Sequence, residues 1–423
     1  MDIDTDRATD WLRSAAIAAR AASSTLARLP GETRNAALHA AAAALRAASA
    51  GIVAANGRDL AAFDAAGGTQ AFRDRLALTP ARVAAMAQGL DDIGELPDPL
   101  SRTLGEWTRP NGLRFQRIAQ PIGVIGMIYE SRPNVGADAA GLCLKAGSAL
   151  ILRGGSDSFQ SARAIHAALI AGLAAVGVPA AAVQIPPETD RAYVAAMLGA
   201  AGLIDLIIPR GGKSLVERVQ REARVPVLAH AEGLCHTYVH RAAEPAMARR
   251  IVANAKMRRT GICGATETLL IDAAVASALL PEIVADLRAL GCEFRAGPRA
   301  RAIVPDLPVA VEGTFDTEWL DSVLSVAVVD DVDHAIRHIL AHGSEHTDAI
   351  ITEDAAVAAY FMNGVDSAVA MWNASTQFCD GGEFGFGAEI GIATGRVHAR
   401  GPVGLEQLTT FRYHVVGTGQ IRP

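Results

Sequence analysis

Short apolar runs alternate with helical stretches from Pro121 onward, and this alternation constrains the fold more than any other feature of the sequence. Five apolar runs follow one another, at residues 122–129, 149–152, 183–185, 204–208 and 226–229. Helical stretches lie between them, at residues 158–176, 189–200 and 213–223. Strands that are buried on both faces are continuously apolar. Their alternation with helices predicts an α/β fold with a parallel, doubly wound sheet.

A second series of the same kind begins near Leu234. Its helical stretches and apolar runs lie at residues 243–257, 267–271, 275–290, 325–329, 348–351 and 368–371. A chain of 423 residues is too long for one simple hydrophobic core, and two or three domains are expected at this length. We therefore predict that two α/β units follow one another along the chain.

The segments that flank these two series have other patterns. Residues 5–65 are Ala-rich and helical with a break at Pro30-Gly31, and residues 79–92 form a further helical stretch. Asn111-Gly112 joins two short segments, and this dipeptide supplies the positive φ angles of a tight hairpin turn. Residues 408–416 predict one last strand.

Composition and charge argue against several classes of protein. The formal net charge is −6 without a basic stripe, so we expect no nucleic-acid partner. The five cysteines are scattered and form no CxxC pair, so we expect neither a disulfide framework nor a bound metal, and we expect a reducing cytoplasm. The acidic first residues differ from a signal peptide. His39 and Arg46 argue against a membrane span in the Ala-rich run.

Cys263 is the foremost candidate for a catalytic residue. It lies in a short loop of small and basic residues between a helical stretch and an apolar run. The thiolate is the reactive form of cysteine, and the neighbouring Lys256, Arg258 and Arg259 would favour it. The alternative is a buried, inert cysteine, which is the usual state of a lone thiol.

A second motif, Gly211-Gly212-Lys213-Ser214, stands between an apolar run and a helical stretch. Backbone N–H groups at the start of a helix can bind a phosphate group. An ordinary turn between a strand and a helix has the same pattern, so the motif alone leaves both interpretations open.

Several longer motifs, in order along nearly the whole chain, make the sequence similar to a known family. They lie at residues 120–135, 144–155, 208–215, 254–268 and 373–410. In these segments the chain resembles the gamma-glutamyl phosphate reductases, which belong to the aldehyde dehydrogenase superfamily. The resemblance implies an aldehyde dehydrogenase-like fold with a Rossmann-type cofactor domain, an α/β catalytic domain and a β oligomerisation arm. The implied boundaries are 1–104 and 120–231 for the NADP-binding domain, 232–397 for the catalytic domain, and 105–119 and 398–423 for the arm.

The resemblance also implies roles for individual residues. Cys263 takes the position of the nucleophile. Arg153 stands where the superfamily has a basic residue against the adenosine ribose, and Ser156 stands where NAD-preferring relatives often have glutamate, which together favour NADPH. The remaining implied cofactor contacts are the pyrophosphate at Gly211, Gly212, Lys213 and Ser214, and the nicotinamide ribose at Glu389.

The substrate contacts stay open between several polar groups. Asn134 or Arg132 could donate to the oxyanion or hold the substrate phosphate, and we assign Asn134 to catalysis and Arg132 to the substrate. Lys256 and Arg259 are alternative phosphate clamps. Gly264 departs from the family, which usually has asparagine there, so an oxyanion hole would rely on backbone N–H groups.

The function implied is reduction of L-glutamyl 5-phosphate to L-glutamate 5-semialdehyde, with NADPH, in proline biosynthesis. We expect a small-molecule substrate and a homo-oligomer, with glutamate 5-kinase as a candidate partner. Rival interpretations are a hydrolytic dehydrogenase of a free aldehyde, a reductase of another acyl phosphate, and a binding or scaffold protein on a decayed fold.

Overall fold

The computed structural model describes residues 5–130 and 132–422, apart from the side chain of Ala71. The chain folds into two compact units. One unit comprises Met1–Ala229, Phe386–Gly391 and Val403–Pro423, and the other comprises His230–Gly385 and Ile392–Pro402.

The first unit contains the predicted parallel sheet. Its strands are β3 (Val124–Tyr129), β4 (Ala149–Arg153), β5 (Val183–Gln184) and β6 (Leu206–Arg210). The spatial order β5-β4-β3-β6, with every pair parallel, is the arrangement of a doubly wound sheet. The prediction of a fifth strand at 226–229 is wrong, because this segment forms only an isolated bridge between Val227 and Ile207.

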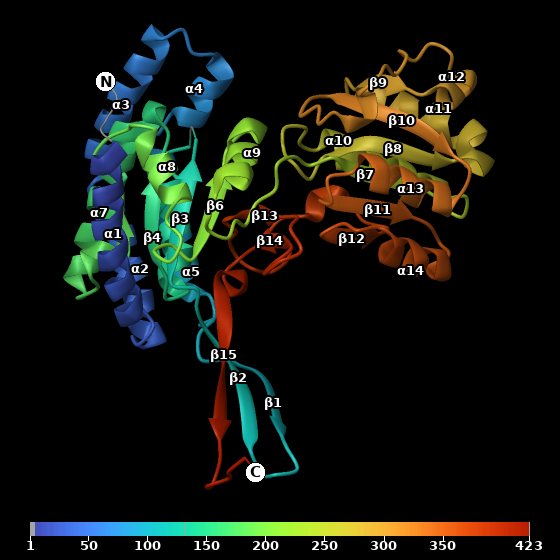
Figure 1. Cartoon of the computed structure of the whole chain (residues 1–423). Coiled ribbons are helices and arrows are strands. Elements are labelled where there is room, and N and C mark those ends of the chain that lie inside the picture. Colours follow the sequence, from blue (N-terminus) through green and yellow to red (C-terminus); the bar gives the residue numbers. More distant parts are fainter. Residues whose placement is uncertain (1–4, 131, 423) are drawn as a thin grey trace. The chain divides into compact units, whose positions relative to one another are not determined.

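Helices cover both faces of this sheet (Figure 1). The helices of the first unit are α1 (Thr5–Leu26), α2 (Gly31–Ala47), α3 (Ser49–Ala65), α4 (Gln70–Leu76), α5 (Pro80–Glu95), α6 (Val135–Lys145), α7 (Phe159–Ala175), α8 (Ala192–Leu198) and α9 (Lys213–Glu222), with the 3₁₀ turns η1 (Ser156–Ser158) and η2 (Ala180–Ala182). The predicted break at Pro30-Gly31 and the predicted start near Thr79-Pro80 are confirmed. Among the described helices, no single one is long and apolar enough to cross a membrane. Only α2 and α3, which are bent relative to each other, reach the required length and apolar composition when they are taken together.

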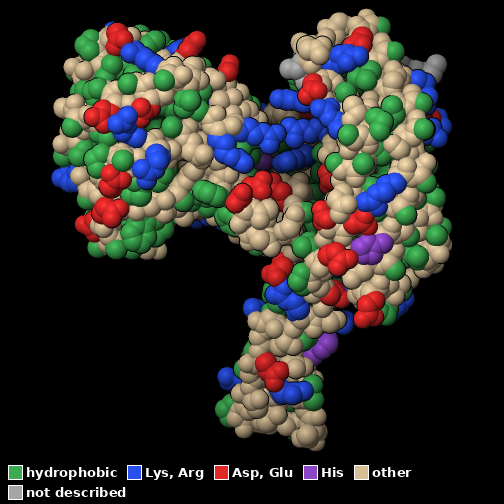
Figure 2. Space-filling view, turned by 180° about the vertical axis from the view of Figure 1, so that it is seen from behind, with side chains coloured by type: hydrophobic (Ala, Val, Ile, Leu, Met, Phe, Trp, Pro, Cys, Tyr) green, Lys and Arg blue, Asp and Glu red, His purple; other side chains and the backbone are tan. Residues whose placement is uncertain are grey.

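A three-stranded antiparallel sheet extends from the first unit (Figure 1). It consists of β1 (Thr103–Thr108), β2 (Arg114–Pro121) and β15 (Thr409–Val416), in the order β1-β2-β15. Trp107 stacks on Phe115 with 5.6 Å between the ring centroids. The surface of this sheet carries exposed hydrophobic side chains and charged groups of both signs (Figure 2). The hairpin and the last strand are confirmed, and we call this sheet the arm.

The second unit is built on a six-stranded parallel sheet. Its strands are β7 (Cys235–Val239), β8 (Thr266–Asp272), β9 (Glu293–Ala296), β10 (Val323–Val329), β11 (Thr347–Ile351) and β12 (Val369–Trp372), in the order β12-β11-β7-β8-β10-β9. Its helices are α10 (Pro245–Met257), α11 (Ala273–Ala289), α12 (Pro298–Ile303), α13 (Val332–His342) and α14 (Ala355–Gly364), with η3 (Thr314–Asp316) and η4 (Thr376–Phe378). The remaining elements of the chain are β13 (Gly391–Ala393), β14 (Gly401–Val403) and η5 (Glu406–Leu408).

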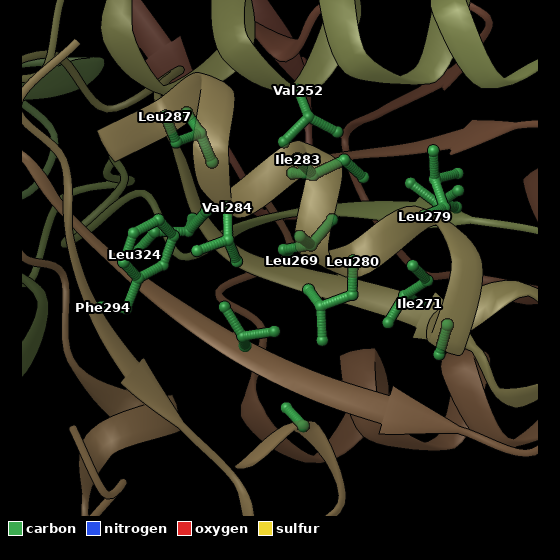
Figure 3. Packing of buried hydrophobic residues seen from close by; sticks show 14 of the residues in the cluster. Val252, Leu269, Ile271, Leu279, Leu280, Ile283, Val284, Leu287, Phe294 and Leu324 are labelled. Atoms are coloured by element: carbon green, nitrogen blue, oxygen red, sulfur yellow. The ribbon is translucent and has the colours of Figure 1, made fainter. Parts of the chain in front are cut away.

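Apolar side chains of α10 and α11 pack on β8 and β10 to form the main core of the second unit (Figure 3). Val252, Leu269, Leu280 and Leu324 are fully buried in it. Burial of one such side chain stabilises the fold by about 1.5–3 kcal/mol. This core holds α10 and β8 in place, and therefore fixes both ends of the loop that carries Cys263.

Candidate functional site

Cys263 lies in the loop between the end of α10 at Met257 and the start of β8 at Thr266. Glu244 caps the first turn of α10 by accepting hydrogen bonds from the N–H groups of Ala246 (2.8 Å) and Met247 (2.6 Å). Among the five cysteines, all of which the structure describes, Cys263 alone is not buried. The loop therefore presents one partly accessible thiol.

Three contacts fix the backbone of this loop. The side-chain amide of Gln377 donates to the carbonyl oxygens of Ala255 (2.9 Å) and Arg259 (3.2 Å). The thiol of Cys235 donates to the carbonyl oxygen of Cys263 at 3.0 Å. Cys263 also packs against the cluster that contains Cys379. Cys235 and Cys379 are both buried, and burial raises the pKa of the Cys235 thiol, so these two thiols support the loop.

Lys256 is buried in an ion pair, which counts against its predicted role as a phosphate clamp. Its side chain is fully buried, and its ammonium nitrogen lies 2.6 Å from a carboxylate oxygen of Glu267. Burial raises the pKa of Glu267 to about 7, against the opposing pull of Lys256. Lys256 therefore joins α10 to β8 beneath the loop, while Arg258 and Arg259 stay exposed at its rim.

Two histidines that the sequence analysis missed stand beside Cys263. One ring nitrogen of His230, one ring nitrogen of His346 and the Sγ atom of Cys263 lie within 4.8 Å of one another. Burial, and to a smaller extent His230, lowers the pKa of His346 to about 3, so its imidazole is neutral near pH 7. Cys263 and His346 come just before β8 and β11, which both neighbour β7. Cys263 and His346 are far apart in the sequence but lie at the amino ends of strands that flank β7. Their proximity could be predicted only from the order of the strands in the sheet.

Gly233 packs directly against the backbone of Cys263. A Cβ atom at Gly233 would lie 2.1 Å from the carbonyl oxygen of Cys263 and 2.7 Å from its Cα atom. Real Cβ atoms essentially never come that close to backbone, so any side chain here must displace Cys263.

We predict that Gly233→Ala lowers kcat by about 100-fold, because a displacement of about 1 Å of a reacting group can cost that much. Steady-state rates with the purified variant would measure this. Gly57→Ala is the control, since a Cβ atom at Gly57 meets nothing within 4 Å. Equal rates for Gly233→Ala and the unmodified chain would contradict the geometry.

Most of the predicted cofactor residues lie at or just after the carboxyl ends of β4 and β6, the two strands that flank β3. Arg153 ends β4 and donates to the carbonyl oxygens of Gly154 and Thr189, both at 2.5 Å. Its Nε atom is buried without a partner among the described residues. Arg153 lines a shallow pocket that is open to solvent, together with Tyr129, Phe159 and Glu188. Ser156 lies exposed just after this strand, at the start of η1.

Gly211, Gly212, Lys213 and Ser214 are exposed at the start of α9, directly after β6. The N–H group of Gly212 donates to a carboxylate oxygen of Glu130 at 3.0 Å. Glu130 therefore occupies one of the N–H groups that the sequence analysis expected to face a pyrophosphate. An anion bound there must displace this exposed carboxylate.

The other predicted contacts are also in the first unit. Asn134 precedes α6 and donates through its amide nitrogen to Asp138 at 3.0 Å. Burial raises the pKa of Asp138 to about 6, although the hydrogen bond from Asn134 lowers it. Arg132 is exposed, and Glu389 is half-buried. The roles given to these three residues stay predictions.

Comparison with known proteins identifies the family. The aldehyde dehydrogenase family model matches residues 5–298. The gamma-glutamyl phosphate reductase of Acidiphilium cryptum is 67% identical over 423 residues, with 100% of each chain covered. That of Gluconobacter oxydans is 70% identical over 404 residues, covering 96% of this chain and 94% of the other.

A solved structure agrees with these relatives. The crystal structure of gamma-glutamyl phosphate reductase from Thermotoga maritima superposes with a TM-score of 0.95 at 40% identity, covering 97% of this chain and 100% of the other. The likeness thus extends over both units and the arm. The chain therefore belongs to the aldehyde dehydrogenase family and, within it, to the gamma-glutamyl phosphate reductases.

Proposed function

We propose that this chain reduces L-glutamyl 5-phosphate to L-glutamate 5-semialdehyde with NADPH, through a thioester on Cys263. The observation that carries the assignment of the nucleophile is the exposure of the thiols. Cys263 is partly accessible on a rigid loop, whereas the other four cysteines are buried. Burial raises the pKa of both Cys143 and Cys292 to about 12, which keeps these two thiols protonated and unreactive.

The reaction begins when the Cys263 thiolate attacks the acyl carbon. A carbon–sulfur bond forms, the bond from the acyl carbon to the phosphate oxygen breaks, and phosphate leaves with the electron pair. NADPH, when bound, supplies the hydride that reduces the thioester. The carbon–sulfur bond of the resulting thiohemiacetal then breaks, which releases the aldehyde and returns the electron pair to sulfur. We assign the leaving phosphate to Arg259 and Arg132, and the oxyanion to Asn134.

We assign the adenosine end of NADPH to the shallow pocket at the end of β4. Its aromatic lining suits a base, and the buried Nε atom of Arg153, which has no partner in the described part of the chain, suits an anion. The exposed Ser156 adds no negative charge that would repel a 2′-phosphate. The start of α9 would hold the pyrophosphate, with Glu130 displaced, and Glu389 would bind the nicotinamide ribose.

We predict that Arg153→Gln raises KM for NADPH by about 10-fold or more and leaves KM for NADH nearly unchanged. The reason is that a hydrogen bond to a charged group contributes about 1.5–3 kcal/mol. Initial rates with each cofactor would measure the two effects. Arg58→Gln, which removes an exposed guanidinium on α3, is the control. An equal loss with both cofactors would show that Arg153 is not the group that selects NADPH.

The reverse reaction tests the function as a whole. Glutamate semialdehyde, NADP⁺ and phosphate are supplied, and the absorbance of NADPH is followed. The proposal requires that NADP⁺ reduction depends on phosphate, because phosphate must resolve the thioester. If the rate is the same without phosphate, water is the acyl acceptor and the chain is a hydrolytic dehydrogenase. In the phosphate-dependent case no carboxylate need activate water, so Glu232 is dispensable.

We also propose that the arm joins subunits in a homo-oligomer. β1 and β15 are the edge strands of the arm, and β15 exposes Phe411, Tyr413 and Val415. Unpaired strand edges with apolar side chains favour association. The acyl phosphate must come from a kinase, and we place the enzyme in the cytoplasm beside glutamate 5-kinase.

We predict that Val415→Asp converts the oligomer to monomers, because it places a charge where the arm would meet a neighbouring subunit. Sedimentation velocity at micromolar concentration would measure the change in mass. Ile17→Asp is the control, since Ile17 is a similarly exposed apolar residue on α1. A monomeric unmodified chain would refute the proposed role of the arm.

A further inference from the structure

We propose that Cys263, His230 and His346 form an inhibitory binding site for Zn²⁺. The binding site itself does not depend on the proposed function. Only its inhibitory effect does, because an ion bound to Cys263 stops catalysis if Cys263 is the nucleophile. The five scattered cysteines, without a CxxC pair, predicted no bound metal. All three residues belong to the second unit, so the site is complete within that unit.

The three donor atoms are close to the spacing that a tetrahedral zinc ion requires. They lie within 4.8 Å of one another. With bonds of about 2.3 Å to sulfur and about 2.0–2.1 Å to nitrogen, tetrahedral donor atoms are about 3.3–3.6 Å apart. Small side-chain rotations would therefore close the site around an ion.

His346 supplies the strongest sign that the site suits a ligand. Its side chain is fully buried, and its Nε2 atom has no partner among the described residues. The Nδ1 atom lies 2.9 Å from the hydroxyl of Thr347 and 3.5 Å from the thiol of Cys235. These contacts fix the ring, while Nε2 forgoes the hydrogen bond that a buried polar atom normally makes. A bound cation would satisfy it.

His230 is oriented in the manner typical of metal-ligating histidines. Its Nδ1 atom lies 2.8 Å from the carbonyl oxygen of Ile392. A carbonyl oxygen only accepts, so Nδ1 carries the proton and Nε2 keeps its lone pair. Such a backbone contact sets the tautomer of a ligating imidazole. His230 and Cys263 are both partly exposed, so an ion can reach the site from solvent.

The chemistry of the donor set favours zinc over hard cations. One thiolate and two imidazoles suit Zn²⁺, and water would fill the fourth position. Binding requires that the Cys263 thiol releases its proton to solvent. The bound ion then holds the sulfur lone pair that would attack the acyl carbon. Zinc binding and thioester formation therefore exclude each other.

Cobalt titration of the reduced full-length chain tests the site directly, because Co²⁺ bound to a thiolate gives an intense near-ultraviolet charge-transfer band. We expect one such Co²⁺ per chain, displaced by Zn²⁺ and removed by a chelator. Cys263→Ala should lose the band. His230→Ala should weaken binding by more than about 10-fold, since even groups that only orient a ligand contribute about 10–100-fold to metal affinity.

His342→Ala serves as the matched control, because His342 is a partly exposed histidine of the same unit whose Nδ1 atom contacts Asp316. It should bind Co²⁺ like the unmodified chain. His346 is fully buried, so His346→Ala could fail to fold, and the half-exposed His230 carries the test instead. A band that survives in Cys263→Ala, an absent band in the unmodified chain, or unchanged binding in His230→Ala would each overturn the site.

Alkylation separates this inference from the proposed function. Zn²⁺ should slow the modification of Cys263 by iodoacetamide, measured by mass spectrometry, and a chelator should restore it. If Zn²⁺ protects Cys263 but Cys263→Ala still turns over, the metal site stands and the proposed mechanism fails. If Cys263→Ala is inactive and Zn²⁺ gives no protection, the mechanism stands and the metal site fails.

Discussion

Cys263→Ala is expected to abolish turnover in both directions while leaving NADPH binding unchanged. Loss of a nucleophile removes the covalent path altogether, and the expected decrease in kcat is on the order of 10⁴-fold or more. Cofactor binding should persist because the predicted cofactor residues lie in the first unit, whereas Cys263 lies in the second. Steady-state rates and fluorescence titration with NADPH measure the two properties separately.

Cys292→Ala is the matched control, because Cys292 is a buried cysteine of the same unit at the edge of the main core. It should lose some stability and keep its activity. Substantial turnover by Cys263→Ala would refute the thioester mechanism. Loss of NADPH binding in that variant would instead show that the substitution disturbs more than the thiol.

Lys256→Met is expected to lower the free energy of unfolding by roughly 3–5 kcal/mol, which is the effect of removing one partner of a buried ion pair. Lys256 and Glu267 are 0% and 1% exposed. Methionine keeps the length of the side chain but leaves the Glu267 carboxyl without its cation. Thermal and urea unfolding, compared with the unmodified chain, would measure the loss.

The loss should grow as the pH rises. Burial holds the pKa of Glu267 in the folded chain above its ordinary value of 4.5, and removal of the ammonium would raise this pKa further. The folded state then binds this proton more tightly than the unfolded state, so the contribution of Glu267 to stability is greatest below about pH 4.5 and decreases as the pH rises. Lys256→Met combined with Glu267→Gln should recover much of the stability. Equal destabilisation at every pH would contradict this account.

The sequence predicted the first unit well because its strands are apolar throughout. β3 and β4 are continuous hydrophobic runs, and the pattern gives their places to within two residues. β7 was not predicted, since its sequence Cys-His-Thr-Tyr-Val is polar although every residue is buried. His236 pairs with Asp348 at 2.8 Å, and Thr237 lies 2.6 Å from Thr266 through their hydroxyl oxygens. Only the tertiary partners make this strand buried.

In the candidate site, too, some residues could be predicted from the local sequence and others only from the tertiary structure. Cys263 could be found from the composition of its loop, whereas Arg153 came only from the resemblance to the family. His230 and His346 could not, because they reach Cys263 through the order of β11, β7 and β8 in the sheet. The burial of Lys256 was also invisible, since lysine is almost never fully buried unless it is paired.

The pairing of β15 with β2 has a consequence for how the chain is made. β2 pairs with β15 along its whole length, from Pro121 opposite Thr409 to Arg114 opposite Val416. During translation, β2 therefore leaves the ribosome almost three hundred residues before its partner strand. The nascent first unit must wait with an open strand edge. A transcript that ends prematurely before Thr409 would leave this edge permanently exposed, and its product should aggregate or be degraded.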